Sequence, residues 1–279
     1  MLFRSMKANN EKPPLSIRVN TLKTSKDHLK NALLSENLEI CDGLYMEEAI
    51  NITNVGNLEE LECFQKGLFQ VQDESSMMVA HILDPQKGDA IMDVCAAPGG
   101  KTTHIAQLME NTGFVLARDI HDHKLRLINE NAKRLGVHNI HTECYDAKEI
   151  DVESFERFDK VLVDAPCTGL GIIRRKPELK YNKKAEDFIK IAELQLEILN
   201  NASKYVKKDG ILLYSTCTIA NEENFNVVER FLCKNKNFEK TDMNAYLPKA
   251  LHTDGIGLQL YPHIHKTDGF FISKLRKKL

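Results

Sequence analysis

Two cysteines stand where a nucleophile could act, each just after an apolar segment typical of a buried strand. They are Cys167, in the string VDAPCTG (residues 163–169), and Cys217, in the string YSTCT (residues 214–218). A thiolate beside helix ends or cations is a strong nucleophile. The commoner alternative is a pair of inert, buried thiols. Because both cysteines follow strands and do not lie within them, we favour reactive thiols.

The string DVCAAPGGKT (residues 93–102) joins a predicted strand to a predicted helix. Its last four letters resemble a phosphate-binding P-loop, but that motif needs a glycine five positions before Gly100, where this chain has Cys95. The adjacent glycines, Gly99 and Gly100, also differ from the GxGxxG dinucleotide fingerprint. What remains is a turn of small residues where a ligand can approach the backbone and the free N–H groups of a helix N-terminus.

Acidic residues follow three successive predicted strands. Asp119 comes 20 residues after Gly99, at the end of the second strand, where a carboxylate can accept both ribose hydroxyls of an adenosine cofactor. Asp146 follows the third strand and Asp164 the fourth. For each one, a helix cap or a turn is the alternative role. The carboxyl ends of parallel strands form one edge of a sheet, where ligands bind in open α/β folds.

From residue 90 onward, short apolar runs alternate with amphipathic segments, which predicts an α/β fold of the Rossmann-like kind with a mainly parallel sheet. Strands are expected at 90–94, 114–118, 140–144, 160–163, 211–215 and 269–275, and helices at 101–109, 124–135, 185–206 and 222–233. Gly136 should end the second of these helices. Residues 1–66 show a different sequence pattern and are expected to form a small α+β subdomain. Residues 67–279 are expected to form the larger domain.

The composition excludes several classes of protein. With 42% hydrophobic residues the chain is not disordered, and 38 Lys and Arg against 40 Asp and Glu argue against a polybasic nucleic-acid binder. The sequence contains no apolar stretch long enough for a membrane helix and no signal peptide, so a cytoplasmic protein is expected.

The remaining cysteines and histidines do not predict a metal site. The seven cysteines are widely spaced without a CxxC motif, which favours neither disulfides nor zinc. The pairs His121 with His123 and His263 with His265 lack further ligands at suitable spacing, so we interpret them as polar loop or strand ends.

Taken together, the strings DVCAAPGGKT, DAPCTGLGIIRRKPELKY, YSTCTIANEEN and TDGFFISKL resemble the RNA 5-methylcytosine methyltransferases, and most closely the RsmB group that acts on 16S ribosomal RNA. The resemblance covers residues 15 to 279. It implies a class I S-adenosylmethionine-dependent methyltransferase fold, S-adenosylmethionine as cofactor and RNA as partner. Separately from the resemblance, we expect a monomer. RsmB proteins usually carry a NusB-like helical domain before this point, and 279 residues leave no room for it.

The resemblance also implies a role for each motif. Cys217 would be the nucleophile, Cys167 would assist product release, and Asp164 would contact the target base and the methionine end of the cofactor. Asp119 would bind the ribose and Asp146 the adenine. The cofactor loop would consist of Cys95, Ala96, Ala97, Pro98, Gly99, Gly100 and Lys101.

These residues suit a cytosine C5 methylation. Carbon 5 is a weak nucleophile until a thiolate adds to carbon 6, and Asp164 could stabilise the charge that develops at N3. A base must then remove the carbon 5 proton, for which Cys167 and a water are both candidates. The target base must be unpaired or flipped out of a duplex.

A basic run lies seven residues beyond Cys167, and with the resemblance it predicts an RNA-binding surface. A solvated face is the alternative. The run holds Arg174, Arg175, Lys176, Lys180, Lys183 and Lys184 against one acid, Glu178. In the N-terminal subdomain, Arg18 is the expected RNA contact.

Three rival interpretations remain. A methyltransferase for small molecules or proteins would not need two cysteines at the sheet edge, and a dehydrogenase is disfavoured by the adjacent glycines. A non-catalytic RNA-binding relative would be expected to have lost Cys217 or Asp164, and both are present. For the target, ribosomal RNA is favoured, with tRNA or another RNA as the alternative.

Overall fold

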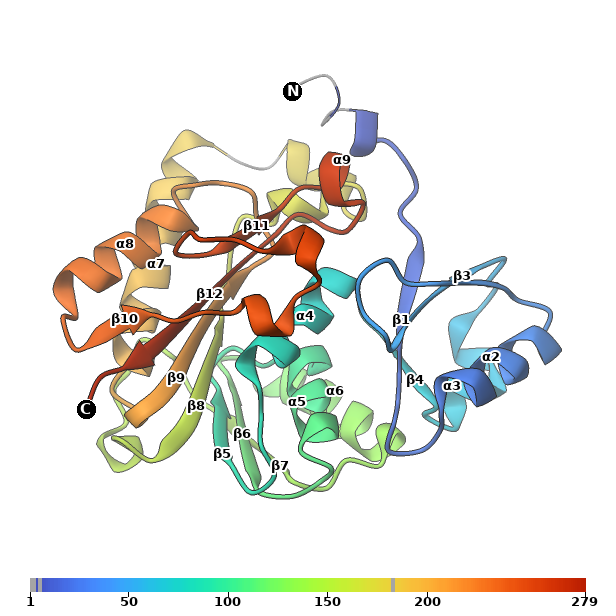
Figure 1. Ribbon diagram of the computed structural model, residues 1–279, viewed down its shortest axis with the longest axis horizontal. Coiled ribbons are helices and arrows are strands. Elements are labelled where there is room, and N and C mark those ends of the chain that lie inside the picture. Colours follow the sequence, from blue (N-terminus) through green and yellow to red (C-terminus); the bar gives the residue numbers. More distant parts are fainter. Residues whose placement is uncertain (1–3, 5–6, 182–183) are drawn as a thin grey trace.

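A computed structural model describes all residues except 1–3, 5–6 and 182–183. Two sheets organise the described chain (Figure 1). The larger sheet has eight strands: β5 (Ala90–Asp93), β6 (Phe114–Asp119), β7 (Ile140–Cys144), β8 (Phe158–Asp164), β9 (Val206–Thr216), β10 (Phe238–Lys240), β11 (Leu258–Leu260) and β12 (Phe270–Lys277).

The strand order of the larger sheet is β10-β12-β9-β8-β5-β6-β7, with β11 paired to β12. Strands β5 to β9 pair in parallel, whereas β12 runs antiparallel to β9. After β7 the chain returns to the other side of β5, so the direction of winding reverses between β5 and β8. Ligands bind at such a reversal, beyond the carboxyl ends of the strands.

Helices cover both faces of this sheet, because alternate residues of its strands point to opposite sides. Ile91 packs on one face with α4 (Glu74–Leu83), α5 (Gly100–Leu108) and α6 (Asp122–Leu135). Its neighbour Met92 packs on the other. That second face is covered by α7 (Ala185–Ala202) and α8 (Phe225–Lys234). The predicted α/β fold with a mainly parallel sheet is confirmed.

The smaller sheet belongs to the N-terminal subdomain and is antiparallel, in the order β2-β3-β1-β4. Its strands are β1 (Leu15–Val19), β2 (Glu39–Asp42), β3 (Ala49–Thr53) and β4 (Phe69–Val71), and its helices α2 (Lys26–Ser35) and α3 (Glu62–Gln65). A separate core, which includes Ile17, Leu29 and Phe69, lies beneath them. Because β4 pairs with β1, this sheet extends a few residues past the boundary that we predicted near Gly67.

The predicted end of the longest helix differs from the structure by four residues. The helix expected at 185–206 ends at Ala202, and Val206 already pairs with Phe158 as the first residue of β9. An apolar repeat cannot separate the end of a buried helix from the start of a buried strand. Gly136, in contrast, ends α6 in the left-handed conformation, as predicted.

Arg18 joins the two subdomains and does not face solvent. It is completely buried, and its guanidinium donates to Gly100 O (2.9 Å), Gln107 Oε1 (3.2 Å) and Thr103 Oγ1 (3.2 Å), as well as to Gln72. Burial lowers the pKa of Arg18 to about 9. The expected RNA contact at Arg18 is therefore wrong, because an isolated basic residue in a sequence gives no sign of whether its partners lie in solvent or in the protein.

Glu48, His81 and His104 extend this buried interface, and they are the one group of three potential metal ligands among the described residues. Glu48 Oε1 lies 2.6 Å from His81 Nε2 and 3.3 Å from His104 Nε2. Burial, together with the nearby Arg18 charge, lowers the pKa of His104 to about 3. The guanidinium also opposes a divalent cation at this position, so we interpret the group as a polar contact between the subdomains.

Replacing Arg18 by Met should lower the free energy of unfolding by about 3 kcal/mol, because it leaves buried acceptors without donors and Glu48 without its nearby countercharge. Chemical denaturation of the variant and of a matched control, Arg126→Met on the exposed face of α6, would measure this. A loss no larger than that of the control would contradict the role assigned to Arg18.

Candidate active site

The loop after β5 allows a ligand to approach its backbone closely. Gly99 has φ 96° and precedes the first turn of α5. A Cβ at Gly99 would lie 3.2 Å from Ile128 Cα, so both the backbone conformation and the space favour glycine. The loop therefore presents its backbone and the N-terminus of α5 at the point where the sheet reverses direction.

Two acidic residues lie on one side of this loop. Asp119, at the end of β6, accepts hydrogen bonds from the backbone N–H groups of Ala97 (3.2 Å) and His121 (3.0 Å). Asp146, beyond β7, accepts one from the N–H of Lys148 (2.9 Å). Both line a cavity of about 520 Å³, a size suited to a nucleoside cofactor, together with Cys95 and Ala97.

A second cavity, of about 300 Å³, lies on the other side of the loop. Ala96, Pro98, Gly100 and Lys101 line this one. Asp164 and Cys217 line both cavities and so stand at their junction. The residues predicted to bind the cofactor thus surround two adjoining cavities, with the exception of Gly99, whose role is conformational.

The two predicted cysteines meet at this junction. Residues Asp164 of β8 and Ser215 of β9 are paired in the parallel ladder, so the segments that follow them run side by side. The Sγ atoms of Cys167 and Cys217 lie 3.1 Å apart. The expectation that both cysteines would gather at one edge of the sheet is therefore confirmed by the geometry.

The surroundings distinguish the two thiols. The hydrogen bond between the two thiols lowers the pKa of Cys217, as does the positive charge of Lys101, although burial and Asp164 act in the other direction. The same hydrogen bond raises the pKa of Cys167, with burial adding to the effect. These directions favour Cys217 as the thiolate of the pair and Cys167 as the hydrogen-bond donor.

Lys101 connects the cofactor loop to Asp164. Its Nζ lies 2.6 Å from Asp164 Oδ2, and Ser215 Oγ donates to Asp164 Oδ1 at 2.7 Å. Burial lowers the pKa of Lys101, but the charge and hydrogen bond of Asp164 outweigh burial and raise it. Lys101 thus carries a positive charge beside Cys217 and holds the Asp164 carboxylate in place.

Two buried acidic residues near the cysteines were not among the site residues predicted from the sequence. Burial raises the pKa of Asp93 to about 7, and this carboxyl accepts a hydrogen bond from Thr102 Oγ1 (2.8 Å) beneath the cofactor loop. Glu223 is completely buried and accepts hydrogen bonds from the Thr168 N–H (2.8 Å), Thr218 Oγ1 (3.2 Å) and Gln195 Nε2 (3.2 Å). Glu223 therefore ties together the residues that follow the two cysteines.

Glu223 was missed because we expected a helix over 222–233, whereas α8 begins at Phe225. The preceding turn directs polar side chains inward: Asn224 accepts from Thr216 Oγ1 (2.6 Å) and donates to Thr218 O (3.1 Å). The sequence signal that could have identified Glu223 is the run of consecutive polar residues ahead of a strongly amphipathic helix. Such a run indicates a helix cap and a buried hydrogen-bond network equally well.

Two arginines of the predicted RNA-binding run form ion pairs with acidic residues of the protein itself. Arg174 and Arg175 both bind Asp268, at 3.0 and 2.6 Å, and Arg175 also binds Asp73 at 2.9 Å. The Arg174 side chain is only 7% exposed. Both charges are compensated within the fold. Arg174 and Arg175 nevertheless line cavities beside the site, so their contact with RNA stays a prediction.

The lysines of the same run differ from the arginines. Lys176 is exposed and lines the 520 Å³ cavity, and Lys180 is exposed and donates to Asn10 Oδ1 at 3.0 Å. Lys183 lies outside the described residues. Lys176 and Lys180 therefore stay predictions as RNA contacts.

No described helix is long and apolar enough to cross a membrane.

The fold and the cavity around the loop after β5 define the Rossmann-like class of S-adenosylmethionine-dependent methyltransferases. Residues 80–276 match the model of the family described as 16S rRNA methyltransferase RsmB/F, and residues 4–59 match that of the RsmF/B-like ferredoxin-like domain. The chain belongs to the RsmB/F family.

Relatives and solved structures agree with this assignment. The chain is 44% identical over 272 residues to the probable ribosomal RNA small subunit methyltransferase B of Bacillus subtilis, with 95% of this chain and 60% of the relative covered. It is 39% identical over 246 residues to a tRNA (cytosine(72)-C(5))-methyltransferase of Pyrococcus horikoshii, with 87% and 61% covered. The chain thus spans about 60% of the length of these relatives.

Among solved structures, NSun6 from Pyrococcus horikoshii with SFG superposes with a TM-score of 0.87 at 29% identity, covering 99% of this chain and 94% of the other. A methyltransferase homologue from the same organism gives a TM-score of 0.85 at 33% identity, with 98% and 90% covered. These matches confirm the predicted fold over both subdomains.

The hydrogen bond between the cysteines makes a prediction for thiol reactivity. In Cys167→Ala, the pH midpoint for alkylation of Cys217 by iodoacetamide should rise, because the thiolate loses its donor; Cys167→Ser should restore part of the shift. The rate is measured by mass spectrometry of the peptide that carries Cys217. An unchanged or lower midpoint in Cys167→Ala would contradict the assignment of thiolate and donor.

Proposed function

We propose that the chain transfers a methyl group from S-adenosylmethionine to carbon 5 of a cytosine in RNA, with Cys217 as the nucleophile. The observation that carries the proposal is the position of Cys217, at the junction of two cavities and 3.1 Å from a second thiol. A methyltransferase for proteins or small molecules has no need of this pair.

The larger cavity suits S-adenosylmethionine. Asp119 is placed to accept the ribose hydroxyls, as acidic residues at this strand end do in related folds, and Asp146 would border the adenine. The loop from Cys95 to Lys101 would surround the methionine end together with Asp164. When bound there, the cofactor supplies a methyl group on a sulfonium for transfer to carbon 5.

The target cytosine would enter the smaller cavity, where Cys217 and Asp164 are exposed to it. The Cys217 thiolate forms a bond to carbon 6, and the electron pair of the ring's 5,6 double bond shifts toward carbon 4, so that charge develops at N3. Lys101 gives a proton to Asp164 along the hydrogen bond between them, and Asp164 passes it to N3, so that Lys101 becomes neutral and no full negative charge stays on the ring. Carbon 5 thereby becomes nucleophilic enough to accept the methyl group.

Release requires the reverse elimination. A water removes the carbon 5 proton, the 5,6 double bond forms again, and Cys217 leaves as a thiolate. The proton on N3 returns to Asp164 and from there to Lys101, which restores the starting charges. The S–H of Cys167 donates a hydrogen bond to the departing sulfur, which is the reason for a second cysteine at this position. The raised pKa of Cys167 suits a proton donor and disfavours Cys167 as the base.

Replacing each cysteine separates the two roles. Cys217→Ala should abolish methyl transfer, whereas Cys167→Ala should accumulate a covalent RNA–protein adduct, because the thiolate leaves less readily without its donor. Tritiated S-adenosylmethionine and denaturing gel electrophoresis measure both outcomes. Turnover by Cys217→Ala would rule out the proposed nucleophile.

The substrate is the small-subunit ribosomal RNA in this proposal, on the strength of the family and of the B. subtilis relative. The similarity to a tRNA methyltransferase supports tRNA as the second candidate. Parallel assays on 16S ribosomal RNA and on tRNA, followed by bisulfite sequencing, would identify the methylated nucleotide in either one.

Glu223 should act as a positioning residue for the cysteines. Glu223→Gln replaces one acceptor oxygen by a donor that faces the Thr168 and Thr218 hydroxyls, so kcat should fall about 10- to 100-fold through misplacement of the two loops. Because Glu223 lines neither cavity, the KM for S-adenosylmethionine should change less than about twofold. The neighbouring, exposed Glu222→Gln is the matched control; equal kinetics for both variants would exclude a positioning role.

A further inference from the structure

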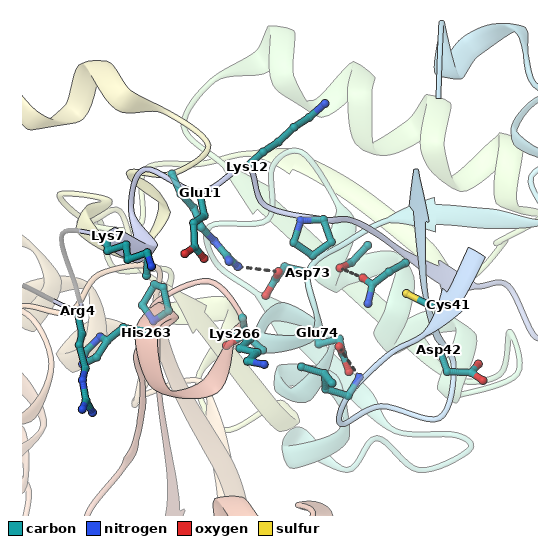
Figure 2. A pocket seen from close by; sticks show the side chains of 18 residues that line it. Arg4, Lys7, Glu11, Lys12, Cys41, Asp42, Asp73, Glu74, His263 and Lys266 are labelled. Carbon is teal, nitrogen blue, oxygen red and sulfur yellow. Dashed lines mark hydrogen bonds and ion pairs between the residues drawn. The ribbon is translucent and has the colours of Figure 1, made fainter. Parts of the chain in front are cut away.

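A third cavity, of about 520 Å³, lies outside the candidate active site, between the N-terminal segment, the small sheet and the C-terminal part of the chain (Figure 2). Lys7 and Lys12 come from the N-terminal segment, Asp42 and Asn51 from the small sheet, and His263 from α9 (Pro262–His265). Figure 1 shows α9 close to this N-terminal segment. Both subdomains therefore form the walls of one cleft.

The acids of this cleft are largely compensated. Asp42 pairs with Lys26 (2.8 Å) and Lys30 (2.7 Å). Glu74 accepts hydrogen bonds from the backbone N–H groups of residues 44, 45 and 46. Asp73 binds Arg175 at 2.9 Å. Among the described residues, Glu11 and Glu74 are the two lining acids without an ion pair, against four lining cations without one.

Apart from Arg174, which pairs with Asp268, the cations of the cleft have no such partners within the described ranges. Four lining cations are exposed and form no ion pair with a described residue: Arg4, Lys7, Lys12 and Lys266. His263 adds two buried ring nitrogens that have no hydrogen-bond partner in the described chain. The cleft therefore presents an excess of positive charge and unused hydrogen-bonding groups, although the whole chain has a formal net charge of −2.

The cleft adjoins the cysteine site. Ser16 and Asp73 line both this cleft and the 300 Å³ cavity that contains Cys217. The ion pairs of Arg174 and Arg175 with Asp73 and Asp268 lie along the same wall. A chain of phosphates in the cleft would thus lead directly to the cavity proposed for the target base.

We propose that the cleft binds the single-stranded RNA next to the target cytosine, with its phosphates on Lys7, Lys12 and Lys266. This inference rests on the proposed function. Exposed lysines with few competing acids attract a polyanion, and a strand whose base enters the cysteine site must be unpaired. The arginines that the sequence suggested for this task hold the wall of the cleft in place.

Charge reversal within the cleft tests the proposal. In Lys12→Glu/Lys266→Glu, the dissociation constant for a 20-nucleotide single-stranded RNA should rise at least about 10-fold. The negative slope of the log association constant against log salt concentration should become shallower by about 1.4, that is about 0.7 for each lost phosphate contact. Fluorescence anisotropy between 50 and 300 mM salt measures both values. Affinity for S-adenosylmethionine, measured by calorimetry, should stay within about twofold, because neither lysine lines the cofactor cavity.

The matched control is Lys208→Glu/Lys236→Glu, which makes the same change in net charge. Both lysines are exposed; Lys208 lies near the amino end of β9, and Lys236 precedes β10. The control should retain the wild-type salt slope. If the cleft variant and the control showed the same slope and affinity, the proposal would be overturned.

Cross-linking gives a second measurement that does not depend on a variant. The wild-type chain, irradiated with the same RNA carrying 4-thiouridine beside the cytosine, should yield cross-linked peptides from residues 7–15 and 261–267. Cross-links confined to other surfaces would refute the cleft. Failure of the wild-type chain to methylate any RNA would count against the proposed function instead, so the two failures can be told apart.

Discussion

The parallel pairing of β8 with β9 is the constraint on which the site depends. Asp164 and Ser215 occupy one rung of this ladder, so Cys167 and Cys217, each a few residues farther along, meet at 3.1 Å. Neither cysteine could be placed so closely by a flexible loop alone, because the entropy of ordering such a loop opposes a single geometry. The sheet thus supplies the precision that the paired thiols need.

Buried charges hold this arrangement in position. Lys101 extends from the cofactor loop to Asp164, and Glu223 connects the segments after the two cysteines. Arg18 links the small subdomain to the carbonyl of Gly100 in the same loop. A buried charge is costly unless every partner is in place, so these contacts tolerate few alternative geometries. The cofactor loop, the cysteines and the N-terminal subdomain are therefore mechanically connected.

The sequence predicted the parts of this account that depend on local pattern. Apolar runs located six of the eight strands of the larger sheet, but not the short β10 and β11. Residues at strand ends located the candidate site, because parallel strands bring their carboxyl ends to one edge. The sequence did not predict contacts between partners distant in the chain. Arg18 and Arg174 are basic residues that the fold buries against acceptors more than 80 residues away, and Glu223 lies in a turn that reads as the first turn of a helix. No local pattern separates such residues from exposed ones of the same type.

The most direct test of the central claim is to locate the covalent bond. A substrate RNA containing 5-fluorocytosine blocks the final proton removal, so the wild-type chain incubated with it and S-adenosylmethionine should remain attached to the RNA. Peptide mass spectrometry after nuclease digestion should place the methylated nucleotide on Cys217. Attachment at Cys167, or methyl transfer without any attachment, would contradict the account.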